Sequence, residues 1–315
     1  MQEKTTPYLR ELFNSSPTIA RQYSQLEDLA TFSLENRDPL EEDAHEVTKG
    51  LVHKYTNRAL VKTSYRCAAH CQFCTRTRQI GSPSGDLTPE NEANIVTYIR
   101  AHTEIDDVIF SGGDPLYTPN VTLRLLRQVS EVPSVKVLRI GTRLPVHNPD
   151  SFNTLPLQNV VEEIDKIAQE KPFFVLINFQ HPDEMTPKTM GVVSKLKETG
   201  ATLLSQTVFL KDINDDEEVL YKLFQGLYHS GVVPYYMYRC DYAKGLEKYI
   251  CDLNKERAIM TSLRTRLSGI ACPTYVVDVE GMGKIPVPLD FWQANSEECL
   301  DFNGNCISIR LPNNE

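Results

Sequence analysis

The chain has 315 residues, of which 33 are basic and 42 acidic, giving a formal net charge of −9. This acidic balance, without a long basic run, argues against a nucleic-acid partner, because phosphate binding needs clustered Lys and Arg. The first residues lack the apolar stretch of a signal peptide, and runs such as 173–177 are too short to span a bilayer, so the sequence predicts a cytoplasmic protein with no membrane partner.

Two kinds of segment alternate along the chain after a polar first fifty residues with helical tendency. Short β-rich runs occur at residues 59–63, 107–111, 136–141, 173–178, 202–208 and 233–238. Helix-length amphipathic segments occur at residues 89–101, 121–132, 160–169, 188–198, 217–229 and 255–267. The strands look apolar on both faces, as buried parallel strands do. The alternation predicts an α/β protein whose parallel sheet is either open or curved into a barrel.

Three cysteines, Cys67, Cys71 and Cys74, follow the first strand in the pattern Cys-x3-Cys-x2-Cys. Three thiolates this close together can hold one iron–sulfur cluster, and three ligands on four irons leave one iron open for a reactive partner such as S-adenosylmethionine (SAM). The alternatives are zinc, a redox pair or three buried thiols. Structural zinc usually takes four ligands in two close pairs, and the sequence has no second close pair. The spacing therefore predicts a metal cluster here, with the remaining cysteines as buried bystanders.

A glycine-rich loop, Gly112-Gly113-Asp114-Pro115, ends the second strand. Paired glycines let a ligand approach the backbone closely, and Asp114 offers an acceptor to an ammonium group. An isolated match of this kind is usually only a turn. Because it comes one crossover after the cysteines, we expect it to hold the amino group of SAM.

The sequence resembles the lysine 2,3-aminomutases from about residue 38 to residue 288. The matching stretches are residues 38–40, 51–58, 65–76, 110–116, 138–143, 181–184, 234–236, 240–241, 277–278 and 283–284. The resemblance implies a partial (β/α)6 barrel of the radical SAM type at residues 51–288, with an N-terminal helical extension at 1–50 and a C-terminal tail at 289–315. It also implies three bound groups: a 4Fe-4S cluster, SAM and pyridoxal 5′-phosphate (PLP).

The same resemblance implies which residues hold the cofactors. Lys284 matches the lysine that forms a Schiff base with PLP, and it is the predicted catalytic residue. Lys54 and Arg58 match basic residues that contact the PLP phosphate; at position 54 the family more often has Arg, whose bidentate fork a lysine lacks. The other cofactor-binding residues that the resemblance implies are Tyr55, Phe73, Gly112, Gly113, Asp114, Asn178 and Gln206.

Three residues match positions that bind the substrate in that family. Arg76 matches the arginine that pairs with the α-carboxylate, for which a planar fork is well suited. Asp241 and Asp278 match two carboxylates that receive the distal ammonium group of lysine, since a buried cation needs such partners. Without the resemblance, both aspartates would be interpreted as caps at strand ends.

The implied function is an isomerase that moves the α-amino group of L-lysine from C2 to C3 through a PLP aldimine radical, giving β-lysine. Its implied partners are a small-molecule amino acid and an external one-electron reductant of the flavodoxin or ferredoxin type, and a homo-oligomer is compatible with the sequence. Two related alternatives are an arginine 2,3-aminomutase and a lysine mutase that serves the modification of elongation factor P. An alternative of another class is an iron–sulfur electron carrier, which would need a fourth thiolate and no PLP lysine.

Overall fold

The computed structural model describes residues 3–25, 32–82, 86–279, 281–291, 298–300 and 305–308. The strands are β1 (Glu46–Thr48), β2 (Leu51–Tyr55), β3 (Arg58–Lys62), β4 (Asp107–Ser111), β5 (Val137–Thr142), β6 (Phe173–Asn178), β7 (Thr202–Val208), β8 (Val233–Tyr238), β9 (Thr274–Val279), β10 (Gly283–Pro286), β11 (Glu298–Leu300) and β12 (Cys306–Ser308). The α-helices are α1 (Pro7–Ser15), α2 (Pro17–Arg21), α3 (Pro89–Ala101), α4 (Pro119–Ser130), α5 (Leu144–His147), α6 (Leu155–Ala168), α7 (Pro187–Lys197), α8 (Glu217–His229) and α9 (Leu253–Arg266).

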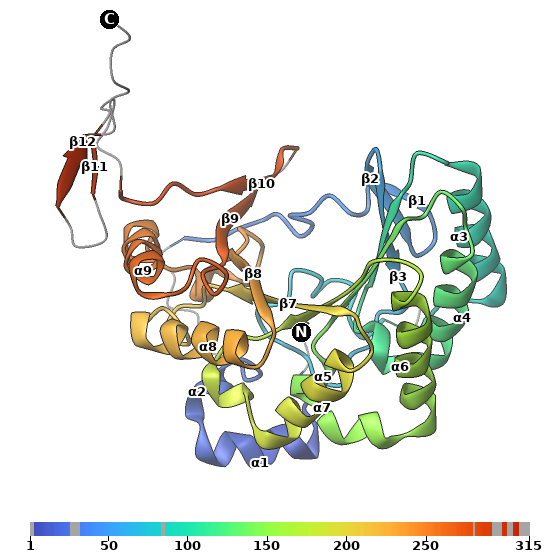
Figure 1. The fold of residues 1–315 in the computed structure, drawn as a ribbon, viewed down its shortest axis with the longest axis horizontal. Helices are drawn as coiled ribbons and strands as arrows, with labels where there is room; N and C mark the ends of the chain where they lie inside the picture. Colours follow the sequence, from blue (N-terminus) through green and yellow to red (C-terminus); the bar gives the residue numbers. More distant parts are fainter. Residues whose placement is uncertain are drawn as a thin grey trace, which may run out of the picture.

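Within the described residues, β1 to β10 form one ten-stranded sheet in chain order, and β11 pairs only with β12. Strands β3 to β9 run parallel. The strands β1 and β2 extend one edge of the sheet in antiparallel fashion, and β10 does the same at the other edge. The first and last strands do not pair, so the sheet curves without closing (Figure 1).

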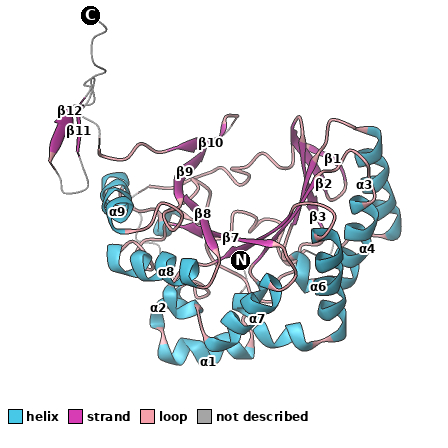
Figure 2. Ribbon diagram, viewed as in Figure 1, coloured by secondary structure: helices cyan, strands magenta, loops and turns pink. Residues whose placement is uncertain are grey.

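The helices lie on the outer face of the curved sheet, and the strands line its inside (Figure 2). Several helices start where Thr or Ser precedes Pro, as at Pro17, Pro89 and Pro187. The hydroxyl caps the free N–H groups and proline fits the first helical position, so the chain carries its own start signals. The predicted helices at 121–132 and 188–198 begin at Pro119 and Pro187; both have proline at the first position, and the second is also capped by the Thr186 hydroxyl, which accepts from the Thr189 N–H.

The predicted α/β fold is confirmed. The six expected strands are β3 to β8, none displaced by more than one residue at its ends, and six helices follow them in β/α order. The parallel strand β9 and the antiparallel edge strands β1, β2 and β10 were not expected. In the first fifty residues, the described helices are α1 and α2, while β1 joins the sheet. The domain boundaries at residues 50 and 288 stay predictions, and most of the tail lies outside the described residues.

The two faces of the strands differ, contrary to the expectation that both are buried in apolar contacts. In β4, Val108 and Phe110 are fully buried under the helices, whereas Ile109 and Ser111 face the concave side. In β5, Leu138 and Ile140 are buried in the same way. The apolar core therefore lies between the sheet and its helices, and the concave face is left for a cavity.

Candidate active site

A cavity of about 660 Å³ occupies the concave face of the sheet. Its walls come from the inward side chains of the strands and from the loops that follow them. Every residue that the sequence predicted for the site lines this cavity: Lys54, Tyr55, Arg58, Cys67, Cys71, Phe73, Cys74, Arg76, Gly112, Gly113, Asp114, Asn178, Gln206, Asp241, Asp278 and Lys284. The structure thus brings these residues together, while the role of each stays a prediction.

The three cysteines of the motif lie in the loop that follows β3 and are free thiols. Burial raises the pKa of Cys67 and Cys71, and it raises the pKa of Cys74 to about 11. These thiols therefore need a positive metal centre to become thiolates at neutral pH. No group of three or more His, Cys, Asp or Glu side chains among the described residues converges on a single metal ion. A four-iron cluster does not require such convergence, because each cysteine binds a different iron.

A polar wall stands behind Cys71. The Arg143 Nη1 atom donates to the Cys71 sulfur at 2.8 Å, and the His147 Nε2 atom lies 3.5 Å from the same sulfur. Arg143 directly precedes α5 and His147 is its last residue, so this short helix brings both side chains to the same sulfur. Burial and then the nearby Arg143 charge hold the pKa of His147 well below its usual range, so its ring is neutral at pH 7.

The wall also contains polar atoms that lack a partner in the described structure. They are Arg143 Nε, His147 Nδ1, Gln22 Nε2 and Tyr23 OH, all buried. Such atoms are rare in folded proteins and mark a missing ion, water or ligand. Three of the four are N–H or O–H donors and the fourth, His147 Nδ1, is a donor in one tautomer, which suits a negatively charged neighbour. The residues around Cys71 therefore fit an anionic iron–sulfur cluster.

The glycine loop packs against the cysteine loop. A side chain at Gly113 would collide with the Arg66 carbonyl, and a Cβ at Gly112 would lie 2.5 Å from the Ser64 oxygen. Gly112 also has φ +113, which favours glycine. The close approach that these glycines allow is therefore to the backbone before the cysteines.

Asp114 is buried and already accepts hydrogen bonds from three donors. Its carboxylate accepts from Thr142 Oγ1 at 2.8 and 3.0 Å, from the Arg143 backbone N–H at 2.7 Å and from the Leu116 N–H at 3.0 Å. Asp114 thus joins the end of β4 to the end of β5 and orients the chain that carries Arg143. Its predicted contact with a SAM ammonium group would have to add to these bonds.

The far edge of the sheet contributes Lys284 and two aspartates. The Lys284 Nζ atom donates to Asp278 Oδ2 at 2.8 Å across the β9–β10 pair. Asp241, just beyond β8, lines the cavity and has no hydrogen-bond donor for its carboxylate in the described structure. Burial, and next the Asp278 charge, raise the pKa of Asp241 to about 7. Two carboxylates against one lysine leave this part of the cavity ready for a further cation.

The two edges of the open sheet approach each other at the mouth of the cavity. A Cβ at Gly283 of β10 would lie 2.9 Å from the Tyr55 hydroxyl of β2. The Gly281 N–H donates to Glu41 at 3.0 Å, and the Lys54 ammonium donates to the same carboxylate at 2.8 Å. This approach explains how basic residues of β2 and β3 share a cavity with Lys284, although the sheet order separates them.

Lys54 and Arg58 are suited to a phosphate. The Arg58 guanidinium lies over the Tyr55 ring, 4.4 Å from its centroid, and no carboxylate among the described residues pairs with it. Lys54 forms an ion pair with Glu41 at 2.8 Å and donates to the Leu40 carbonyl at 3.1 Å. Two cations beside a lysine that lines the same cavity form a donor set that fits PLP.

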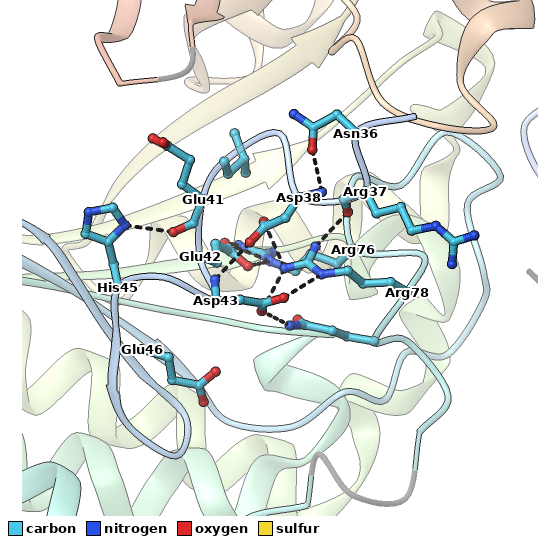
Figure 3. Close-up of polar contacts among 12 residues, drawn as sticks. Asn36, Arg37, Asp38, Glu41, Glu42, Asp43, His45, Glu46, Arg76 and Arg78 are labelled. Atoms are coloured by element: carbon cyan, nitrogen blue, oxygen red, sulfur yellow. Dashed lines mark hydrogen bonds and ion pairs between the residues drawn. The ribbon is translucent and has the colours of Figure 1, made fainter. Parts of the chain in front are cut away.

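Arg76, the predicted receptor of the substrate carboxylate, already holds a carboxylate (Figure 3). Its Nε and Nη2 atoms donate to Glu42 at 2.6–3.0 Å, and its Nη1 atom donates to Ser111 Oγ at 3.3 Å and to the Gly112 carbonyl at 3.1 Å. Glu42 is buried, and although burial alone would raise the pKa of Glu42, the Arg76 charge and hydrogen bonds hold it below its usual range. A second carboxylate on Arg76 has to compete with Glu42.

Three further predicted residues line the cavity with partners of their own. Gln206 donates to the Tyr238 hydroxyl at 2.9 Å. Asn178 accepts from the Gln180 side chain, and the Phe73 ring lies 5.2 Å from the Arg143 guanidinium. Each leaves part of its side chain at the cavity surface, where contact with a nucleoside or a cofactor ring remains a prediction.

The sequence did not identify several residues of the site. Arg143 belongs to a matched stretch but was given no role, and a cation directly after a strand is the signal that points to it. Glu184 also belongs to a matched stretch, 181–184, and was given no role. Gln22, Glu41 and Glu42 gave no usable signal, because their contacts join segments far apart in the chain.

The described part of the chain contains no helix long and apolar enough to cross a membrane.

The sequence model of the Radical SAM superfamily matches residues 61–224.

Three curated relatives, each named L-lysine 2,3-aminomutase, are similar to this chain. The protein of Methanococcus maripaludis is 34% identical over 90% of this chain and 65% of its own length. That of Clostridium subterminale is 32% identical over 90% of this chain and 68% of its own. That of Escherichia coli is 34% identical over 81% of this chain and 73% of its own. The chain thus spans about two thirds of the length of these relatives.

Proposed function

The chain belongs to the radical SAM superfamily and, within it, to the L-lysine 2,3-aminomutase family, and from this premise we propose that it converts L-lysine into β-lysine. Membership implies an enzyme with a 4Fe-4S cluster and SAM. PLP as a further cofactor, lysine as the substrate, an external one-electron reductant and a cytoplasmic location are parts of the proposal. In the proposed reaction the α-amino group moves from C2 to C3.

The observation that carries the proposal is the unpaired Asp241 carboxylate. It lies in the same cavity as the three cysteines and Lys284, with a raised pKa caused by its burial and by Asp278. A distal ammonium group bound there gains two carboxylate partners and relieves the repulsion between them. A distal carboxylate would add a third negative charge, so the same geometry disfavours glutamate.

The basic residues at the mouth of the cavity would hold PLP. Arg58 and Lys54 would bind its phosphate, and the Lys284 amine would bind its carbonyl carbon. Lys284 must be neutral to do so, which requires it to give up its proton and its bond to Asp278. That exchange leaves Asp278 available, beside Asp241, for the substrate ammonium.

Arg76 would receive the α-carboxylate after Glu42 releases it. When bound, the cluster and SAM supply a carbon radical, and PLP supplies the conjugated ring that makes nitrogen migration between neighbouring carbons accessible. The chain's own contribution is to fix both ends of the substrate and to exclude water and oxygen from the cavity.

An anaerobic assay with SAM, PLP and dithionite tests the proposal on lysine, arginine and glutamate in parallel. We expect a β-amino acid from lysine, no product from glutamate, and no product from any substrate in the Cys74→Ala variant. A product from arginine at a higher kcat/KM than lysine would replace lysine as the substrate. No product from any amino acid, in protein that cleaves SAM, would contradict the aminomutase assignment.

A further inference from the structure

The three cysteine sulfurs have unequal surroundings. Cys71 is in contact with two side-chain nitrogens, from Arg143 at 2.8 Å and His147 at 3.5 Å. Cys74 accepts one backbone N–H, from Arg76 at 3.3 Å. In the described structure, no N–H donor reaches the Cys67 sulfur. A positive charge is therefore in direct contact with only one of the three.

That charge is held in place from several sides. The Arg143 Nη2 atom donates to Glu184 at 2.5 Å and to Gln22 at 2.6 Å, and the guanidinium lies 5.5 Å from the Tyr23 ring centroid and 5.2 Å from that of Phe73. Arg143 is 7% exposed and Glu184 is fully buried. The other titratable groups facing Arg143 are Tyr23, the neutral His147, and Asp114, which accepts the backbone N–H of Arg143. Because Arg143 and Glu184 are both buried, neither is screened by water.

The segment before the barrel completes this wall. The Gln22 carbonyl accepts from the Gln72 N–H at 2.8 Å, and the Lys4 carbonyl accepts from the His70 N–H at 2.9 Å, so residues of the N-terminal segment bind the cysteine loop itself. Gln22 thus contacts both the loop and Arg143. Neither contact could form if residues 3–25 were an independent extension.

We propose that Arg143 is a positioning residue that sets the reduction potential of the cluster, with Glu184 opposing it. One-electron reduction adds one negative charge to the cluster, while no proton moves and no bond is broken. A buried cation that donates a hydrogen bond to a ligating sulfur stabilises the reduced form, and a buried anion nearby destabilises it. This assignment rests on the cluster alone and requires neither PLP nor lysine.

The test is a redox titration of the purified protein, without SAM, PLP or amino acid, with dithionite as the electron donor. The reduced cluster is measured by electron paramagnetic resonance. In Arg143→Gln we expect the ratio of reduced to oxidised cluster at fixed potential to fall at least tenfold, equivalent to about 59 mV for one electron. In Glu184→Gln we expect the ratio to rise, because the same cation then lacks its counter-charge.

Two further variants separate charge from hydrogen bonding and from loss of structure. The double variant Arg143→Gln with Glu184→Gln restores charge balance, so its potential should lie between those of the single variants. The matched control is Arg239→Gln, which breaks a buried pair of the same kind, Arg239 with Glu256 at 2.6 Å, outside the cavity wall. Its potential should stay at the unaltered value.

Opposite shifts in the two single variants support the assignment. Shifts of the same sign, no shift in either variant, or an equal shift in Arg239→Gln would overturn it. If Arg143→Gln fails to fold, Glu184→Gln decides the question alone, and no rise in its ratio overturns the assignment. Because the titration omits PLP and lysine, its outcome does not depend on the proposed aminomutase activity.

Discussion

Two groups of residues line one cavity, and they differ in whether their charged side chains have partners of opposite charge. On the cysteine side, formed by Cys67, Cys71, Cys74, Arg143, His147 and Glu184, the two oppositely charged side chains, Arg143 and Glu184, are buried and paired with each other. On the lysine side, formed by Lys54, Arg58, Asp241, Asp278 and Lys284, Asp241 lacks a donor and Arg58 lacks a carboxylate in the described structure. Both features lie at the surface of the same cavity.

This difference in charge pairing indicates which ligands each side is suited to bind. On the cysteine side the charges of Arg143 and Glu184 already balance, so this side suits an iron–sulfur cluster that is bound through the cysteine sulfurs. A side with an unpaired anion and an unpaired cation gains most from a ligand that carries both charges, as PLP and a diamino acid together do. A substitution on one side should therefore impair the function of that side and leave the function of the other intact.

The largest expected effect comes from removing a cysteine. Alanine at Cys67, Cys71 or Cys74 should abolish SAM cleavage and lower bound iron, because two thiolates cannot hold the cluster. Iron analysis and the yield of 5′-deoxyadenosine measure both effects. Cys306→Ala, at an exposed position, should change neither. Full iron content in all three variants would contradict the assignment of the cluster to these cysteines.

A change on the lysine side should affect substrate use and leave radical generation intact. In Asp241→Asn we expect kcat/KM for lysine to fall about 10²-fold or more, taking ~3 kcal/mol for a lost buried charge partner. SAM cleavage by dithionite-reduced protein should stay close to normal, since Asp241 is not among the residues that contact the sulfurs of Cys67, Cys71 and Cys74. Normal turnover of lysine by this variant would mean that the ammonium binds elsewhere.

The pH dependence of lysine binding provides a third separation. The pKa of Asp241 in the ligand-free protein is raised to about 7, first by burial and then by Asp278. The carboxylate must be ionised to pair with an ammonium group, so KM for lysine should fall as pH rises from 6 to 8, approaching tenfold per unit below pH 7. Steady-state kinetics across this range measure it. A flat profile in the unaltered protein, or the same slope in Asp241→Asn, would contradict the assignment.

The smallest expected effect concerns Glu42, which holds the guanidinium of Arg76. Replacing the carboxylate by an amide in Glu42→Gln weakens a competitor of the substrate, so KM for lysine should fall about two- to fivefold, a change of under ~1 kcal/mol. Glu41→Gln is the matched comparison. It frees Lys54 and should alter PLP affinity with little change in KM. A higher KM in Glu42→Gln would show instead that Glu42 holds Arg76 in its binding position.

The sequence predicted the alternation of strands and helices because proline and glycine signals and apolar runs are local. The spacing of the three cysteines predicted a cluster site, whereas Lys284 was indicated only by the resemblance to the lysine 2,3-aminomutases; the structure places all four residues at one cavity. The partner of Arg76 was not predictable in the same way, since Glu42 reaches it across 34 positions through a bent segment. The edge strands β1 and β10 were missed because they have three and four residues, too few to give a periodic pattern.

The central claim is that the cysteine side and the lysine side act on one substrate in a shared cavity. An isotope experiment tests this claim most directly. The protein is reduced anaerobically with SAM, PLP and lysine deuterated at C3, and the recovered SAM is analysed by mass spectrometry. If the radical generated on the cysteine side reaches substrate held on the lysine side, deuterium should accumulate at C5′ of SAM while SAM itself is not consumed. Recovered SAM without deuterium, in protein that forms β-lysine, would contradict a shared cavity for the two steps.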